Sequence, residues 1–88
     1  MHTRRMLIVD DEKDFRTVLR AFFEIKGFVV SEATDGVEAL EKVNKESFDV
    51  VLTDLRMPGP DGLAVLRSVK SVCPESVVMY VFRADWTN

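Results

Sequence analysis

The sequence lacks most of the features that mark secreted, membrane-spanning or nucleic-acid-binding proteins. Its single cysteine, Cys73, excludes a disulfide within the chain and is typical of a reducing compartment. No apolar run approaches the roughly 18 residues that a membrane helix needs, and the run after the basic N-terminus is too short for a signal peptide. A net charge of -3 without a basic cluster argues against nucleic-acid binding. We therefore expect a cytoplasmic protein that binds neither membranes nor, by this chain alone, nucleic acid.

Several motifs of ligand-binding proteins are absent as well. The sequence has neither a Walker A nor a GxGxxG motif. The acidic run at 10–14 begins like an EF-hand loop, but Phe15 stands where that loop needs glycine and Ala21 where it needs glutamate. The same negative charges would repel the phosphate of a flavin cofactor. A phosphatase or hydrolase with Asp54 as nucleophile is disfavoured, because the residue two positions further is Arg56 rather than a second acid.

The chain is long enough for one domain and too short for two. Its 88 residues, 47% of them hydrophobic, fit a single domain over 1–88 and argue against intrinsic disorder. Short apolar runs alternate with segments of helical periodicity. The runs predict four strands, at 6–9, 28–31, 48–53 and 77–82. The segments between them predict three helices, at 12–26, 35–45 and 61–73.

Each predicted helix has an apolar face that we expect to be buried. Asp35 and Asp61 are suitable N-caps for the second and third helices. Gly27 and Pro74 are suitable stops for the first and third. The positions expected to be buried are Phe15, Val18, Leu19, Phe22 and Phe23 in the first helix, Val37, Ala39, Leu40 and Val43 in the second, and Leu63, Leu66, Val69 and Cys73 in the third.

The alternation of strands and helices predicts how the domain is arranged. Nearly all-apolar strands that are separated by helices are typical of a parallel sheet with helices on both faces. Because crossovers between parallel strands are right-handed, the topology reduces to an open, doubly wound α/β sheet. We therefore expect an α/β fold of this kind.

Acidic residues stand at the ends of two predicted strands. The first strand runs into Asp10 and Asp11, and the third runs into Asp54. Open parallel sheets bind ligands at the carboxyl ends of the strands, where the strand order reverses. If the two strands are neighbours, the three carboxylates converge and repel one another unless a cation offsets their charge. Such oxygen ligands suit Mg²⁺ before Ca²⁺ or Mn²⁺ and disfavour zinc. The alternative interpretation is that the aspartates only begin turns.

Three blocks of the sequence resemble the receiver domain of two-component response regulators. They are LIVDDE at 7–12, ATDGVEAL at 33–40 and DVVLTDLRMPGPDG at 49–62, in the order and spacing of that family. The resemblance covers the chain up to about residue 81. It implies a flavodoxin-like fold with the strand order 2-1-3-4-5. It also implies a signalling module that is not an enzyme in the ordinary sense, although receivers assist their own phosphorylation and dephosphorylation.

The resemblance implies a role for each residue of the site. Asp54 would accept a phosphoryl group from a phosphohistidine of a sensor histidine kinase or a phosphotransfer protein. Asp11 would bind Mg²⁺ directly and Asp10 mainly through water. Asp54 and the backbone carbonyl of Arg56 would be further ligands. The cation would neutralise the negative charge that a phosphoryl group brings beside these carboxylates.

Two departures from the family pattern point to an alternative function. Alignment places Val81 where receivers have a serine or threonine that binds the phosphoryl group, and no lysine follows Lys70. Family members continue into a fourth helix, a fifth strand and a fifth helix, so we expect a truncated receiver that lacks these elements. Its fourth strand, 77–82, would then be an exposed apolar edge that promotes self-association. The alternative is a phosphorylation-incompetent, receiver-derived module for interaction or oligomerisation.

Overall fold

The computed structural model describes residues 3–54 and 61–81, which form four strands and three helices. In chain order these are β1 (Arg5–Val9), α1 (Lys13–Ile25), β2 (Val29–Ala33), α2 (Gly36–Lys45), β3 (Val50–Asp54), α3 (Gly62–Val72) and β4 (Val77–Val81). Every predicted element is confirmed, with bounds that differ by at most two residues; residue 82 lies outside the described residues. None of the three helices in the described ranges is both long and apolar enough to span a bilayer.

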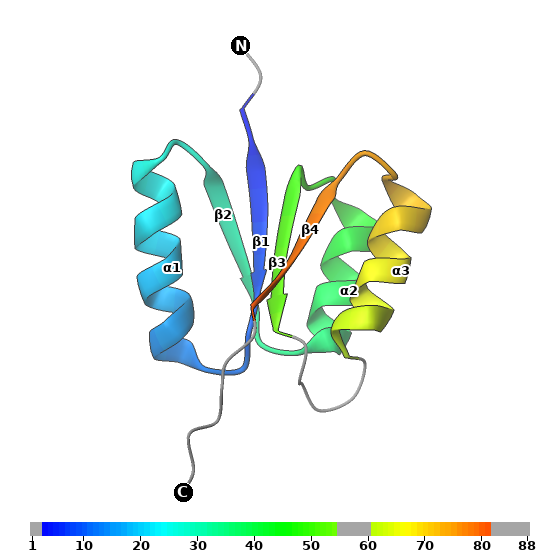
Figure 1. Ribbon diagram of the computed structural model, residues 1–88, viewed down its shortest axis with the longest axis horizontal. Helices are drawn as coiled ribbons and strands as arrows, with labels where there is room; N and C mark the ends of the chain where they lie inside the picture. Colours follow the sequence, from blue (N-terminus) through cyan, green and yellow to red (C-terminus); the bar gives the residue numbers. More distant parts are fainter. Residues whose placement is uncertain (1–2, 55–60, 82–88) are drawn as a thin grey trace, which may run out of the picture.

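All four strands are parallel and lie in the order β2-β1-β3-β4. α1 covers one face of the sheet, and α2 and α3 pack side by side on the other (Figure 1). This arrangement confirms the predicted doubly wound α/β sheet. The strand order reverses between β1 and β3, because the chain adds β2 beyond β1 and β4 beyond β3. The carboxyl ends of β1 and β3 are therefore the place where this topology predicts a ligand.

Side chains on the two faces of the sheet build two separate apolar cores. Successive residues of a strand point to opposite faces, so Leu7 and Val9 face α2 and α3, whereas Met6 and Ile8 face α1. All four are at most 1% exposed, which makes β1 the centre of the domain. The larger core contains Leu7, Val9, Ala33, Ala39, Val43, Phe48, Val51, Val65 and Val69, and the smaller one contains Met6, Ile8, Val30 and Leu52.

The buried face of α1 is narrower than its sequence pattern predicts. Leu19 and Phe23 pack against the smaller core as expected, and Phe15 is half-buried. Val18 is 66% exposed and Phe22 is 52% exposed, so the prediction that these two residues are buried is wrong. The physical reason is that, among the described strands, the backbone of α1 lies close to β1 and β2 but not to β3 or β4. Two strands cover only part of the apolar stripe.

The first turns of α2 and α3 also differ from the prediction. Val37 is 53% exposed and Leu63 is 49% exposed, so their predicted burial is wrong. Side chains in the first turn of a helix lean towards its N-terminus, which here lies at the open carboxyl edge of the sheet. In α3 the core position near the N-terminus is taken by Val65 instead. Of the other predicted positions, Ala39, Val43 and Val69 are buried and Leu40, Leu66 and Cys73 are half-buried.

Local signals fix three helix ends where the sequence places them. Asp35 Oδ1 accepts a hydrogen bond from the backbone N–H of Glu38 at 2.9 Å, which caps α2. Asp61 Oδ1 accepts one from the N–H of Ala64 at 3.1 Å, which caps α3. Gly27 follows α1 with a φ of 96°, a left-handed conformation that favours glycine.

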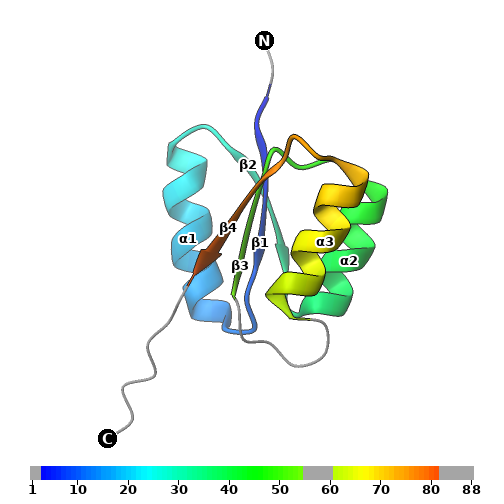
Figure 2. The same ribbon diagram turned by 45° about the vertical axis from the view of Figure 1, so that its right-hand side comes forward.

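Within the described residues, β4 is an edge strand. It pairs with β3 on one side, and Figure 2 shows it from the other. Val78 packs against the larger core, whereas Val77 and Met79 are 54% and 46% exposed. The strand therefore presents apolar side chains next to backbone groups that the described sheet does not pair.

Candidate metal centre

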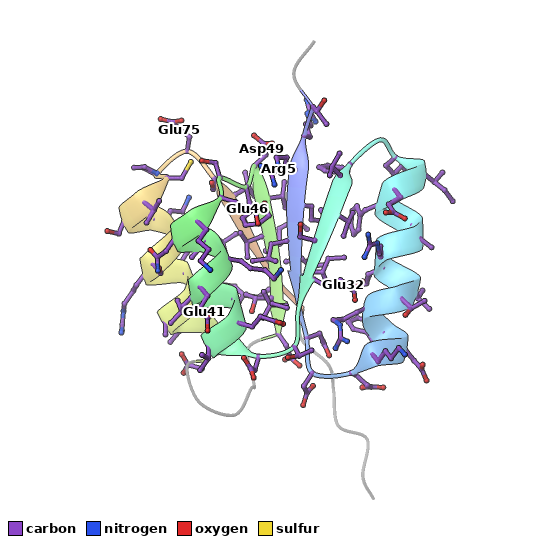
Figure 3. All side chains as sticks on the ribbon, turned by 180° about the vertical axis from the view of Figure 1, so that it is seen from behind. Arg5, Glu32, Glu41, Glu46, Asp49 and Glu75 are labelled. Carbon is purple, nitrogen blue, oxygen red and sulfur yellow. The ribbon has the colours of Figure 1, made fainter. Side chains whose placement is uncertain are left out.

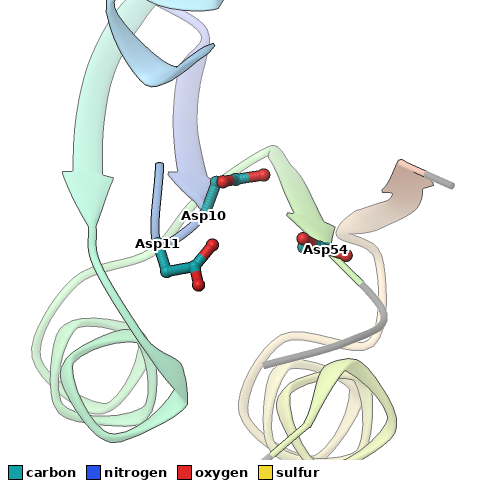
Figure 4. Close-up of side chains that lie close together, drawn as sticks. All are labelled: Asp10, Asp11 and Asp54. Carbon is teal, nitrogen blue, oxygen red and sulfur yellow. The ribbon is translucent and has the colours of Figure 1, made fainter. Parts of the chain in front are cut away.

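Three aspartates meet at the carboxyl edge of the sheet. Asp10 and Asp11 directly follow β1, and Asp54 is the last residue of β3. The register pairs Val9 with Thr53, so the next position on each strand brings Asp10 beside Asp54. Each aspartate offers one carboxylate oxygen, and these three atoms lie within 4.8 Å of one another (Figure 4). The structure thus brings together the three carboxylates that the sequence singled out.

The three carboxylates differ in exposure. Asp10 is 1% exposed and Asp54 is 5% exposed, whereas Asp11 is exposed to solvent. Two like charges 4 Å apart repel by about 1 kcal/mol in water and by about 4 kcal/mol at an effective dielectric constant of about 20. A cation that contacts the carboxylates offsets this repulsion. The exposure of Asp11 keeps the site accessible from solvent.

The donor set fits a hard divalent cation. All three side chains supply carboxylate oxygens, which Mg²⁺ and Ca²⁺ prefer, and the group contains no histidine or cysteine that would select zinc. Mg²⁺ usually combines one or two carboxylates with several waters, and the exposed side chain of Asp11 is in contact with solvent. The residues present therefore fit the predicted Mg²⁺ site. Arg56, whose backbone carbonyl is the remaining predicted ligand, lies outside the described residues.

Hydrogen bonds fix the backbone around Asp10. Its N–H donates to the carbonyl oxygen of Ala33 at 3.1 Å, which extends the pairing of β1 and β2 by one residue. Its Oδ1 accepts a hydrogen bond from the N–H of Glu12 at 2.8 Å. Aspartate commonly begins a turn in this way. Asp10 therefore begins a turn, as the alternative interpretation of the aspartates proposed. At the same time its carboxylate is one of the three that converge at the site.

Asp54 ends β3 next to a fully buried threonine. Thr53 Oγ1 donates a hydrogen bond to the carbonyl oxygen of Asp54 at 3.1 Å. On the β4 side, the register pairs Asp54 with Val81, the last residue of β4. Val81 is the residue that the family resemblance leads us to expect in place of a serine or threonine.

Arg16, which the sequence motifs did not single out, is buried beside the site and only 9% exposed. Its Nη1 donates a hydrogen bond to the carbonyl oxygen of Asp10 at 2.8 Å, and its Nε donates to Glu32 Oε1 at 2.9 Å. Arg16 precedes Leu19 by three residues and Phe23 by seven, so it shares their core-facing side of α1. That spacing is the signal that could have indicated it.

Glu32 of β2 lies between the strand and α1 and joins two arginines of that helix (Figure 3). Its Oε1 accepts the bond from Arg16, and its Oε2 accepts one from Arg20 Nη1 at 2.8 Å. The hydrogen bond from Arg20 lowers the pKa of Glu32 most; burial opposes this shift, and the bond from Arg16 adds to it. Glu32 is therefore ionised at neutral pH.

The fold and the site together define an α/β domain that holds acidic residues at the point where the strand order of a parallel sheet reverses. Comparison with known families identifies the family. The model of the response regulator receiver domain matches residues 6–85. The chain belongs to this family and is a receiver domain of two-component response regulators.

Two curated relatives match almost the whole chain. The transcriptional regulatory protein ResD of Bacillus subtilis is 33% identical over 84 residues, which are 96% of this chain and 35% of ResD. Sporulation initiation phosphotransferase F of the same species is 36% identical over 84 residues, which are 96% of this chain and 67% of that protein. The chain thus spans about a third of the length of one relative and two thirds of the other.

A solved structure confirms the receiver fold. The response regulator TrrA of Thermotoga maritima, crystallised in complex with Mg²⁺-BeF, aligns with a TM-score of 0.84 at 29% identity. The alignment covers 93% of this chain and 71% of the TrrA chain. The strand order of the described sheet is the one that the resemblance implies for its first four strands.

Proposed function

We propose that this chain acts in the cytoplasm as a phosphoacceptor in a two-component phosphorelay. Asp54 takes the phosphoryl group from a phosphohistidine of a sensor histidine kinase or a phosphotransfer protein. The observation that carries this proposal is the convergence of Asp10, Asp11 and Asp54 at the carboxyl edge of the sheet. Membership of the receiver family supports it, because phosphorylation of an aspartate in the presence of Mg²⁺ is typical of that family.

The transfer to Asp54 is a displacement at phosphorus. A carboxylate oxygen of Asp54 forms a bond to the phosphorus atom as the bond from phosphorus to the histidine nitrogen breaks. The electron pair of the broken bond stays with the imidazole, and the product on this chain is an acyl phosphate. The transferred group spreads negative charge over three oxygens.

The surrounding aspartates contribute to this transfer by offering ligands for a cation that compensates charge. Bound Mg²⁺ supplies positive charge that offsets the charge of the phosphoryl oxygens. Asp10, Asp11 and Asp54 are the described residues that would hold the ion. One oxygen of Asp10 already accepts the Glu12 N–H, which supports the indirect, water-mediated role expected for Asp10. The chain remains a signalling module whose chemistry is limited to gaining and losing its own phosphoryl group.

A phosphorylation assay tests this function. The chain is incubated with Mg²⁺ and a small acyl phosphate donor, and its intact mass is measured. We expect one phosphoryl adduct on the wild type and none on Asp54→Ala. Asp14→Asn is the matched control, because Asp14 is an exposed aspartate in the first turn of α1, and this variant keeps the adduct. Absence of an adduct on a folded wild type that binds Mg²⁺ would contradict the proposal.

A second candidate function is that of a phosphorylation-incompetent interaction module that self-associates through β4. Two observations favour it. β4 is an edge strand in the described sheet and exposes Val77 and Met79. The residue that pairs with Asp54 in the register is Val81, whose side chain has no hydroxyl with which to bind a phosphoryl group. Self-association that persists in a chain without an adduct would favour this second function.

A further inference from the structure

We propose that Arg16 is a positioning residue for the carboxylate site. Arg16 holds the peptide group between Asp10 and Asp11, and Glu32 in turn holds Arg16. The part of this inference that concerns Mg²⁺ rests on the proposed function. The part that concerns the backbone stands on the hydrogen bonds of the described residues alone.

The contact is made to an atom that both ligand-bearing residues share. The carbonyl oxygen of Asp10 belongs to the peptide unit that links Asp10 to Asp11. The six atoms of a peptide unit are close to planar and include the Cα atoms of both residues. A hydrogen bond that fixes the oxygen therefore restricts the direction in which both carboxylates leave the backbone. The bond from Arg16 Nη1 is buried and 2.8 Å long.

Glu32 and Arg20 limit the freedom of Arg16. The planar guanidinium of Arg16 donates from Nε to Glu32 and from Nη1 to Asp10, so the two bonds fix its orientation. The second oxygen of Glu32 is bound by Arg20, which prevents the glutamate from turning away. Glu32 stands on a strand that is hydrogen-bonded to β1. Arg16, Glu32 and Arg20 therefore form a clamp. It connects the segment that carries Asp10 and Asp11, the carboxylate loop, to the hydrogen-bonded strands of the sheet.

Charge and position predict opposite effects of removing Arg16. A positive side chain close to a cation site weakens cation binding by repulsion, so its removal would strengthen Mg²⁺ binding if charge alone mattered. If the arginine positions the ligands, its removal weakens Mg²⁺ binding. Loss of residues that orient metal ligands typically lowers metal affinity about 10- to 100-fold. The sign of the change in affinity separates the two roles.

The test measures the Mg²⁺ dissociation constant of the full chain by calorimetry. We expect Arg16→Met to bind Mg²⁺ about tenfold more weakly than the wild type, as for other residues that orient metal ligands. Lys13→Met is the matched control, because it removes one positive charge from an exposed position in the first turn of the same helix and leaves the bonds of Arg16 to Asp10 and Glu32 in place. We expect this control to bind Mg²⁺ as tightly as the wild type or more tightly. Equal or tighter binding by a folded Arg16→Met would overturn the proposal.

A second variant and a second measurement complete the test. Arg16→Lys keeps the charge and most of the stem but lacks the planar fork, so we expect Mg²⁺ binding between that of the wild type and Arg16→Met. Nuclear spin relaxation without Mg²⁺ reports the backbone order of Asp11 and Glu12, which we expect to fall in both Arg16 variants and not in Lys13→Met. Wild-type affinity and unchanged order in Arg16→Lys would overturn the proposal. A wild type that binds no Mg²⁺ contradicts the proposed function, and the relaxation data then decide the role of Arg16.

Discussion

Asp54 and Val81 occupy paired positions at the ends of β3 and β4. The candidate phosphoacceptor thus lies next to a residue whose side chain can neither donate nor accept a hydrogen bond. In the receiver family this place belongs to a serine or threonine. A substitution that gives residue 81 a hydroxyl therefore tests how much the phosphorylation of Asp54 depends on such a group.

Replacing Val81 with threonine should increase phosphorylation. The new hydroxyl offers a hydrogen bond to the phosphoryl group on Asp54, and a hydrogen bond to a charged group contributes about 1.5–3 kcal/mol. We expect a larger fraction of Val81→Thr than of wild type to carry the adduct at equal donor and Mg²⁺ concentrations, as measured by intact mass. Val77→Thr makes the same chemical change at an exposed position at the other end of β4 and should leave the fraction unchanged. Equal fractions in all three proteins would contradict this prediction.

Neutralising Asp54 should stabilise the chain without Mg²⁺ and remove most of its stabilisation by Mg²⁺. Asp54→Asn removes one of three neighbouring negative charges, and the relief of repulsion from one neighbour amounts to about 1–4 kcal/mol, between its value in water and that at an effective dielectric constant of about 20. For the wild type, Mg²⁺ at ten times its dissociation constant should add about 1.4 kcal/mol. Urea unfolding with and without Mg²⁺ measures both effects. A less stable Asp54→Asn in the absence of Mg²⁺ would show that the carboxylates do not strain the fold.

The ion pairs of Glu32 should make stability depend on pH in the acidic range. The arginine contacts lower the pKa of Glu32 below its ordinary value of 4.5. The unfolded chain therefore binds more protons in this range, and the free energy of unfolding rises with pH. The contribution of Glu32 is complete above pH 4.5 and disappears as the pH falls through its pKa in the folded state. Unfolding of Glu32→Gln should show a smaller loss on acidification than the wild type, whereas Glu41→Gln, an exposed change on α2, should follow the wild type.

A charge on the exposed edge of β4 should reduce self-association. Met79 is 46% exposed on this strand, and a lysine at such a position opposes pairing with the edge of another sheet. Sedimentation velocity at micromolar concentrations should show a concentration-dependent shift for the wild type that Met79→Lys reduces. Val37→Lys, on the first turn of α2, places the same charge on another exposed apolar residue and should leave the shift unchanged. A wild type that stays monomeric would refute self-association through β4.

The sequence predicted the strands, the helices and the convergence of the three aspartates, because all of these follow from local patterns. Strand ends are marked by Asp10 and Asp54, and helix starts by the capping residues Asp35 and Asp61. The parallel sheet follows from the alternation of elements, and it brings the strand ends together without any further information.

The helix faces and the clamp on the carboxylate loop could not be predicted in the same way. Burial of Val18 and Phe22 depends on how many strands α1 covers. The hydrophobic periodicity of the helix sequence gives no information about that number. The role of Arg16 depends on Glu32, which is 16 residues away and belongs to another strand. Only the packing of α1 on β2 brings the two side chains together.

The ion pairs of Glu32 also determine how β2 aligns with β1. The register places Glu32 beside Ile8, on the face that Val30 shares, whereas Ala33 faces the opposite core. A slip of β2 by one residue would turn Glu32 towards the apolar core under α2 and α3 and take it away from both arginines. A buried charge without its partners costs several kcal/mol. Glu32 therefore favours the observed register of β1 and β2, because a shift by one residue in either direction would separate it from both arginines.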